Sequence, residues 1–355
     1  MCARLVLSKE RIKMLNTAHK QEVENGDVSF ALVDSRSNPA WHSFANKVFD
    51  SDSGDVSISE IMSGAKLSNW NVRLEDVAPA FPNHNFITDS FLVVRDNPYT
   101  AGNTDVLSVV GSRYKVVQNE ELFSFAENLH DGNPDVKVDS AGSLKQGRIV
   151  YGSWTLPNEL IIDPKGVADK TKLYLIVWTS HDGSVAVQAA ITPVRVRCQN
   201  TLNLAMKSAK QSFKIRHTQT AEGKILAARE ALGLSVAYFD SFSKQANELY
   251  QASITDKQFS DLIRNLYPKP EKDAKGAMKK WENKVVLIDE LYHNSPTNAG
   301  IKGTKWGALN ALTERLDYFR SARKGNTESL SASASGFDPV ITAEKNKILK
   351  AVLAI

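Results

Sequence analysis

Cysteine is scarce in this chain of 355 residues, which contains only Cys2 and Cys198. Two thiols so far apart make neither a disulfide framework nor a paired-cysteine zinc site. Long apolar runs are also missing. No stretch approaches the roughly eighteen residues of a membrane-spanning helix, and the N-terminus lacks the apolar region of a signal peptide. We therefore expect a cytoplasmic protein that makes no contact with a membrane.

Motifs that bind nucleotides or metals are absent as well. The chain has no GxxxxGK[ST] loop, no HExxH pair and no spaced cluster of carboxylates. Ser180, His181 and Asp182 are neighbours in the chain, whereas a catalytic triad is assembled in space from separate positions. We expect a protein that is not an enzyme, with no catalytic residues, no metal site and no cofactor.

Acidic residues are absent from one long window, 183–221, although the whole chain carries 40 acids against 44 lysines and arginines. Such a window predicts a surface for a polyanion, and nucleic acid is the commonest polyanionic partner. The candidate phosphate-binding residues in and beside this surface are Arg195, Arg197, Lys207, Lys210, Lys214 and Arg216. The alternative for these side chains is a solvated face, or ion pairs with acids elsewhere in the chain.

Two smaller basic groups lie earlier in the chain. Arg113, Tyr114 and Lys115 are consecutive, and a tyrosine in such a group either stacks on a base or is half-buried in the core. Lys145 and Arg148 flank a predicted hairpin tip, where they either reach a phosphate or serve solubility.

The order of the hydrophobic patterns predicts an α+β fold, with a β-rich first half and a helical second half. In the first half we expect an antiparallel β-meander with a packed helix. The expected domains are an N-terminal arm over 1–56, a β-rich core over 57–220, a helical region over 221–323, and a flexible link with a terminal amphipathic helix over 324–355.

Local patterns place the elements of the β-rich core. Ser57 and Glu60 have the spacing of a capping box, and Asn119 is expected to cap a helix that runs to residue 130. Strands are predicted over 86–95, 107–117, 136–144, 148–156 and 172–180, with a loop over 157–170.

Asp182-Gly183 is the dipeptide favoured in a two-residue hairpin turn, in which both residues take a positive φ. A loop of that length pairs Tyr174 with Ile191. The apolar alternation of the return strand then changes phase at 192–193, which predicts a β-bulge there. The bulge turns the two arginines at the end of this strand away from the apolar face.

Helices are predicted in the rest of the chain. One covers 201–213 and carries Lys207, Lys210 and Lys214 on a single polar stripe. Thr255 and Thr304 are expected to cap two further helices. The second of these contains Lys305, Trp306 and Asn310, and its N-terminus either holds a phosphate or belongs to the core.

Several segments together resemble the DUF932 family of phage and plasmid proteins. They are NWNVRLEDV, VVGSRYKVVQNEELFSFAENL, AGSLKQGRIVYG, SHDGS, VRVRCQNTLNLAM, KIRHT and GTKWGALNALTERLDYF. The resemblance covers most of the chain, from about residue 41 to the C-terminus. It implies an origin in a mobile element, and with it the cytoplasm of a bacterial host.

The order of the elements is similar to that of Rad52-like single-strand annealing proteins: a helix, a β-meander with hairpin turns and a second helix. This similarity implies a Rad52-like core, a basic groove for single-stranded DNA and a homo-oligomer, often a ring. We expect an ATP-independent protein that binds and anneals single-stranded DNA in recombination or replication. The alternative is a mobile-element protein whose basic face binds a host protein or counters a host defence.

Overall fold

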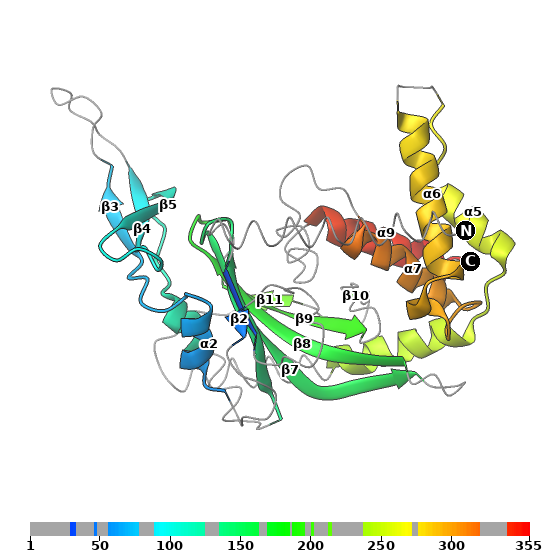
Figure 1. Ribbon diagram of the computed structural model, residues 1–355, viewed down its shortest axis with the longest axis horizontal. Coiled ribbons are helices and arrows are strands. Elements are labelled where there is room, and N and C mark those ends of the chain that lie inside the picture. Colours follow the sequence, from blue (N-terminus) through cyan, green and yellow to red (C-terminus); the bar gives the residue numbers. More distant parts are fainter. Residues whose placement is uncertain are drawn as a thin grey trace.

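The computed structural model describes residues 29–32, 46–47, 56–77, 89–124, 135–162, 169–184, 187–195, 200–201, 212–214, 237–271, 276–319 and 339–355. Within these ranges the fold is α+β, as predicted. Two β-sheets occupy the first part of the chain, and helices make up most of the second (Figure 1).

The larger sheet has eight strands, joined in the order β10-β9-β8-β7-β6-β1-β2, with β11 also paired to β9. All of its pairs are antiparallel except β1 with β2. The strands are β1 (Ser29–Leu32), β2 (Asn46–Lys47), β6 (Lys137–Leu144), β7 (Ile149–Ile162), β8 (Asp169–Ser180), β9 (Gln188–Arg195), β10 (Asn200–Thr201) and β11 (Ser212–Lys214).

The loop predicted over 157–170 is wrong, because β7 and β8 continue through most of it. Glu159 pairs with Lys172, and Ile162 pairs with Asp169. The register shifts between Thr155 and Glu159, so the residues around Pro157 form an irregularity inside a long hairpin. Polar residues and a proline resemble a loop in the sequence, but a bulge accommodates them within a strand.

The predicted register between β8 and β9 is wrong by one residue. Tyr174 pairs with Thr192 and not with Ile191, and the pairing runs without a shift from Thr171 to Trp178. The predicted bulge at 192–193 is therefore absent from this ladder. Pro193 lies between the part of β9 that pairs with β11 and the part that pairs with β10. This interruption suits a residue that has no N–H to donate.

The predicted helix over 201–213 is wrong at both ends. Thr201 belongs to β10, and Ser212–Lys214 form β11, which pairs with β9. Residues 202–211, which include Lys207 and Lys210, lie outside the described part of the chain. Both short strands add to the outer edge of β9, and helical periodicity reveals neither pairing.

A smaller sheet has the order β3-β4-β5, with β3 (Arg73–Asp76), β4 (Ser90–Asp96) and β5 (Thr104–Gly111). α2 (Ile58–Gly64) precedes it, and both hydrogen bonds of the predicted capping box between Ser57 and Glu60 are present. Residues 119–124 are helical, as predicted. The N-cap role predicted for Asn119 is wrong, because Asn119 is already inside the helix and its side chain bonds elsewhere.

The helical part comprises residues 237–251, α5 (Asp256–Leu266), α6 (Ala277–His293), the short 3-10 helix η1 (Pro296–Asn298), α7 (Lys305–Tyr318) and α9 (Pro339–Leu353). Thr255 and Thr304 cap α5 and α7, as predicted. Trp306 is fully buried. Of the two alternatives for the start of α7, a phosphate site or a part of the core, the burial of Trp306 agrees with the core.

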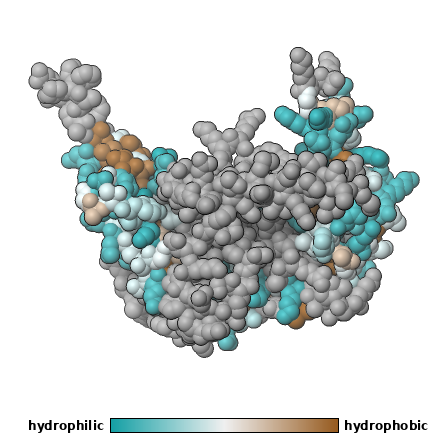
Figure 2. Space-filling view, viewed as in Figure 1, coloured by the Kyte–Doolittle hydropathy of each residue, from teal (hydrophilic) through white to brown (hydrophobic). Residues whose placement is uncertain are grey.

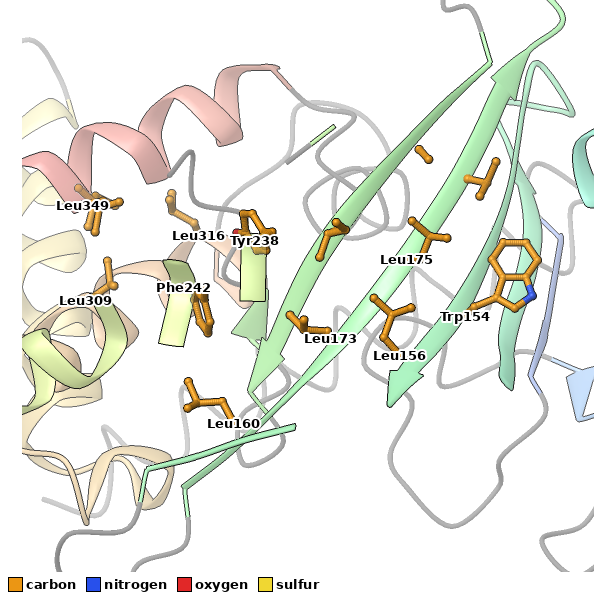
Figure 3. Close-up of a cluster of buried hydrophobic side chains, with 14 of the residues drawn as sticks. Trp154, Leu156, Leu160, Leu173, Leu175, Tyr238, Phe242, Leu309, Leu316 and Leu349 are labelled. Atoms are coloured by element: carbon orange, nitrogen blue, oxygen red, sulfur yellow. The ribbon is translucent and has the colours of Figure 1, made fainter. Parts of the chain in front are cut away.

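One buried apolar cluster joins the large sheet to the helices. Leu160, Leu173 and Leu175 extend from one face of β7 and β8 (Figure 3). The same cluster includes Tyr238 and Phe242 from the helix over 237–251, and it reaches Leu309 on α7. The helices therefore cover one face of the sheet at the end opposite to the small sheet (Figure 1).

Candidate nucleic-acid interface

Two segments from elsewhere in the chain are hydrogen-bonded to residues 180–183, at the end of β8. The backbone carbonyl of Arg148, in the β6–β7 turn, accepts a hydrogen bond from the N–H of His181 at 2.7 Å. From the segment after β5, the Tyr114 hydroxyl donates to the Ser180 carbonyl at 3.2 Å. Ser108 on β5 donates its hydroxyl to the His181 carbonyl at 2.7 Å. The segment 180–183 is thus the joint between the two sheets.

The β6–β7 turn has a left-handed backbone at three consecutive residues. Lys145, Gln146 and Gly147 have φ values of 54°, 57° and 86°. A Cβ atom at Gly147 would collide with the guanidinium group of Arg95 and crowd the ring of Trp70. Glycine is therefore required both by the backbone angle and by the close approach of these two side chains.

Arg95 is a buried cation beneath this turn. Its guanidinium carbon lies 4.0 Å from the centroid of the Trp70 ring, and its Nε atom donates to Asp105 Oδ2 at 3.0 Å. Burial lowers the pKa of Arg95, although the hydrogen bond and the charge of Asp105 act in the opposite direction. Arg95 therefore holds the turn in place and is not available to a ligand.

His181 is fully buried at the joint, beside the ring of Trp70. Its Nε2 atom lies 3.0 Å from Asn119 Oδ1. The amide nitrogen of Asn119 donates to the Leu67 carbonyl, so Oδ1 is the acceptor and His181 carries its proton on Nε2. Burial lowers the pKa of His181 to about 4, and the charge of Arg95 acts in the same direction. His181 is a neutral structural residue.

The turn after His181 differs from the predicted two-residue turn. Gly183 has a φ of 72°, but Asp182 does not have a positive φ, so the two residues do not form the predicted type I′ turn. Asp182 Oδ1 instead accepts a hydrogen bond from the N–H of Ser184 at 2.9 Å. Partial burial opposes ionisation of Asp182, but hydrogen bonds from Ser184 and Ser180 and the charge of Lys145 lower its pKa.

Four exposed cations surround the joint: Arg113, Lys115, Lys145 and Arg148. We call these four residues the basic tip. Tyr114 is half-buried between two of them, and a Cβ at Gly183 would lie 3.7 Å from its ring. Burial and the nearby charge of Asp182 raise the pKa of Tyr114 to about 12. The structure therefore brings together the two smaller basic groups, which are far apart in the sequence.

An apolar patch lies on the small sheet, close in sequence to Arg113. Val106 and Val109 are 57% and 61% exposed, and Leu74 is 36% exposed. Figure 2 shows apolar side chains gathered over β3, β4 and β5, on a surface that is otherwise largely hydrophilic where it is described. The cations of the basic tip thus have an exposed apolar patch close to them in the chain.

The residues of the acid-free window are only partly within the described chain. Arg195 ends β9, and its backbone pairs with Asn200, while Lys214 in β11 pairs with Gln188. Gln188 and Arg195 are the two ends of β9, so these two cations start from backbone positions about 23 Å apart at the usual strand rise. Arg197, Lys207, Lys210 and Arg216 lie outside the described residues.

The residues that hold the joint together were not predicted from the sequence. Gln118 accepts a hydrogen bond from the N–H of Val72 and donates one to its carbonyl, at 3.0 Å and 2.7 Å. Asn119 bonds Leu67 and His181, at separations of 52 and 62 residues. No local pattern signals such distant partners. The only available signal was the run of polar residues between two apolar segments.

The described residues contain no group of three or more His, Cys, Asp or Glu side chains placed to hold a metal ion. Within those same ranges, no helix is long and apolar enough to cross a membrane.

A comparison with family models matches residues 106–335, well over half of the chain, to the family described as "Domain of unknown function (DUF932)". No curated protein and no solved structure matches the chain. The comparisons therefore support the DUF932 resemblance and bring no support for the Rad52-like one. The matched region includes the basic tip and most of the helical part.

Proposed function

This chain belongs to the DUF932 family, and from its basic tip we propose that it binds single-stranded DNA through the phosphate backbone. The observation that carries the proposal is the joint itself. Two turns with four exposed cations are both hydrogen-bonded to the segment 180–183. The two segments that carry the four cations are thereby anchored to the same residues of the chain.

The chemistry of the basic tip suits a polyanion that is not read by sequence. Lysine and arginine neutralise phosphates and release counterions, whichever bases the strand carries. The exposed valines of β5 add an apolar surface beside the cations, which suits the faces of unpaired bases. A duplex hides those faces, so a single strand fits this combination better.

We further propose that the bound strand keeps its base edges free, so that a complementary strand pairs without ATP. In this proposal the protein neutralises charge and aligns the strands, and no bond is made or broken. In this proposal the cations of the acid-free window 183–221 add further phosphate contacts, and several copies of the chain, in a ring or another homo-oligomer, add more. Recombination or replication of a phage or plasmid, in a bacterial cytoplasm, is the corresponding setting.

Binding of a fluorescent oligonucleotide across a range of salt concentrations tests the proposal. We expect the double variants Arg113→Ala/Lys115→Ala and Lys145→Asn/Arg148→Ala to weaken binding. A plot of log K against log salt has a negative slope, and each lost phosphate contact should make that slope shallower by about 0.7. Asparagine is chosen at residue 145 because it tolerates the left-handed backbone there. The triple variant Lys207→Glu/Lys210→Glu/Lys214→Glu tests the acid-free window in the same assay.

Lys257→Ala/Lys302→Ala is a matched control, because both lysines are exposed and lie in the helical part, away from the joint. It should bind as the wild type does. Annealing of complementary strands can be followed in the same samples. Binding of the wild type without salt dependence, or tip variants that bind as tightly as the control, would overturn the proposal. An acidic protein partner would then be the better explanation of the basic surface.

A further inference from the structure

The end of α5 and the start of α6 carry a second group of cations, far from the joint. α5 ends at Leu266 and α6 begins at Ala277. The indole Nε1 of Trp281, in the second turn of α6, donates to the Tyr267 carbonyl at 2.7 Å. This bond fixes the start of α6 against the end of α5. We call residues 267–271 and 276–284 the elbow.

The elbow has more cations than acids. Its residues contain four lysines against two acids, Glu271 and Glu282. Of the described lysines, Lys269, Lys279 and Lys280 are exposed, and Lys284 is half-buried. Trp281 is also half-buried, so an aromatic ring lies among the lysines and is partly accessible.

Beneath these residues, two cations share one tyrosine ring and one carboxylate. Lys284 Nζ lies 4.6 Å and the Arg315 guanidinium carbon 5.1 Å from the centroid of the Tyr267 ring. Glu344 Oε1 accepts from Arg315 at 2.8 Å and from the Tyr267 hydroxyl at 2.9 Å. Burial lowers the pKa of Lys284, and the charge of Arg315 lowers it further, while Glu344 acts in the opposite direction. One carboxylate does not balance two cations, so the site retains excess positive charge.

We propose that the elbow is a second contact surface for the same single-stranded DNA, with Lys279, Lys280 and Lys284 at its phosphates and Trp281 against a base. This inference rests on the proposed function of the basic tip. Lysines interleaved with a partly accessible aromatic ring are the combination by which proteins hold single strands without sequence preference. A phosphate at Lys284 offsets part of the positive charge that Lys284 and Arg315 place around the Tyr267 ring.

The position of the elbow allows one strand to reach both surfaces. Figure 1 shows the small sheet and the first turns of α6 at the two ends of the long axis, both extending to the same side of the molecule. A strand long enough to contact both is held more tightly than a short one, because the second contact forms within the same complex. A short oligonucleotide gains nothing from the second surface.

The experiment compares Lys279→Ala/Lys280→Ala with the control Lys257→Ala/Lys302→Ala in binding to a long oligo-dT. Each variant loses two exposed lysines from the helical part, and Lys257 lies at the other end of α5 from the elbow. In the elbow variant the negative slope of log K against log salt should be shallower by about 1.4, because each of two lost phosphate contacts on a single strand contributes about 0.7. Lys279→Arg/Lys280→Arg keeps the charge and should restore wild-type binding.

The results separate failure of this inference from failure of the proposed function. If the elbow variant has the salt slope of the control while the tip variants lose affinity, the elbow is not a DNA contact and the proposed function stands. If the wild type itself shows no salt-dependent binding, both proposals are overturned. If the elbow variant and the tip variants each weaken binding to long oligo-dT, and the elbow variant has a smaller effect on a short one, both are supported.

Discussion

His181 and Asn119 are joined by a buried hydrogen bond: the His181 Nε2 atom lies 3.0 Å from Asn119 Oδ1, and neither residue has exposed surface. This one contact connects the end of β8 to the helix over 119–124, and through the Leu67 carbonyl to the segment before β3. The positions of the cations in the basic tip depend on it, although neither residue belongs to the tip.

Replacing Asn119 with alanine should destabilise the protein. The change leaves the N–H of His181 and the carbonyl of Leu67 buried without their partner, and such losses cost about 1–3 kcal/mol. Urea unfolding of the Asn119→Ala variant measures the cost. Asn283→Ala, at an exposed position on α6, is the control and should stay within about 0.5 kcal/mol of the wild type. Equal stabilities for the two variants would contradict the role of the buried bond.

His181 should make the protein less stable as the pH falls from 7 to 5. Its pKa is about 4 in the folded protein and about 6.5 in the unfolded chain, so the unfolded chain binds more protons over this range. Stability is therefore lost as pH decreases, by about 2 kcal/mol between pH 7 and 5. Arg95 stays charged and Asp182 stays ionised over the range, so neither reverses the sign.

The control for this pH dependence is His181→Gln, which keeps a side-chain N–H but cannot be protonated near neutral pH. Unfolding free energies of the wild type and the variant, measured in urea at pH 7, 6 and 5, should differ in slope. The remaining titratable groups are common to both proteins and cancel in the comparison. Parallel slopes would mean that His181 titrates normally and is not buried as described.

Gly147→Ala should destabilise the β6–β7 turn more than Gly102→Ala destabilises its own turn. Both glycines have φ values above 80°, so both substitutions carry the cost of a left-handed backbone. A Cβ at Gly102 meets nothing within 4 Å, whereas one at Gly147 collides with Arg95 and crowds Trp70. We expect an additional loss of about 1–3 kcal/mol at Gly147. The two thermal or urea midpoints measure the difference directly, and equal losses would count against a tightly packed turn.

Lys345→Met should destabilise the contact between α7 and α9. Lys345 Nζ lies 2.7 Å from Asp317 Oδ1, and their side chains are 0% and 5% exposed. Removing one member of a buried ion pair leaves the other charge buried and costs about 3–5 kcal/mol. The double variant Lys345→Met/Asp317→Leu should recover much of the loss. A double variant less stable than either single one would show that the pair is not coupled in this way.

Local chemistry predicted the elements of the fold that depend on neighbouring residues. The capping box at Ser57 and the N-caps at Thr255 and Thr304 require only residues three positions away, and all three are present. The spacing of Phe259 and Leu262 in the sequence likewise puts them on one side of α5, and both are buried. These features depend on residues within one or two helical turns of each other, so the sequence alone reveals them.

Features that depend on distant partners were missed. β11 pairs with β9 although 202–211 separate it from β10, and helical periodicity concealed this pairing. The register of β9 depends on how the chain turns after His181, and Asp182-Gly183 suggested a different loop length. The basic tip was predicted as two separate groups, because only the hydrogen bonds to Ser180 and His181 bring them together.

Pro193 has a consequence for how copies of the chain can associate. It lies between the two short strands that pair with the outer edge of β9. A strand from another molecule that approached this edge would find it already divided between β10 and β11, with a residue between them that has no N–H. Interruptions of this kind protect sheet edges from unwanted strand addition and aggregation. The outer edge of β9 is therefore already paired on both sides of Pro193, which disfavours the addition of a strand from another copy directly to β9.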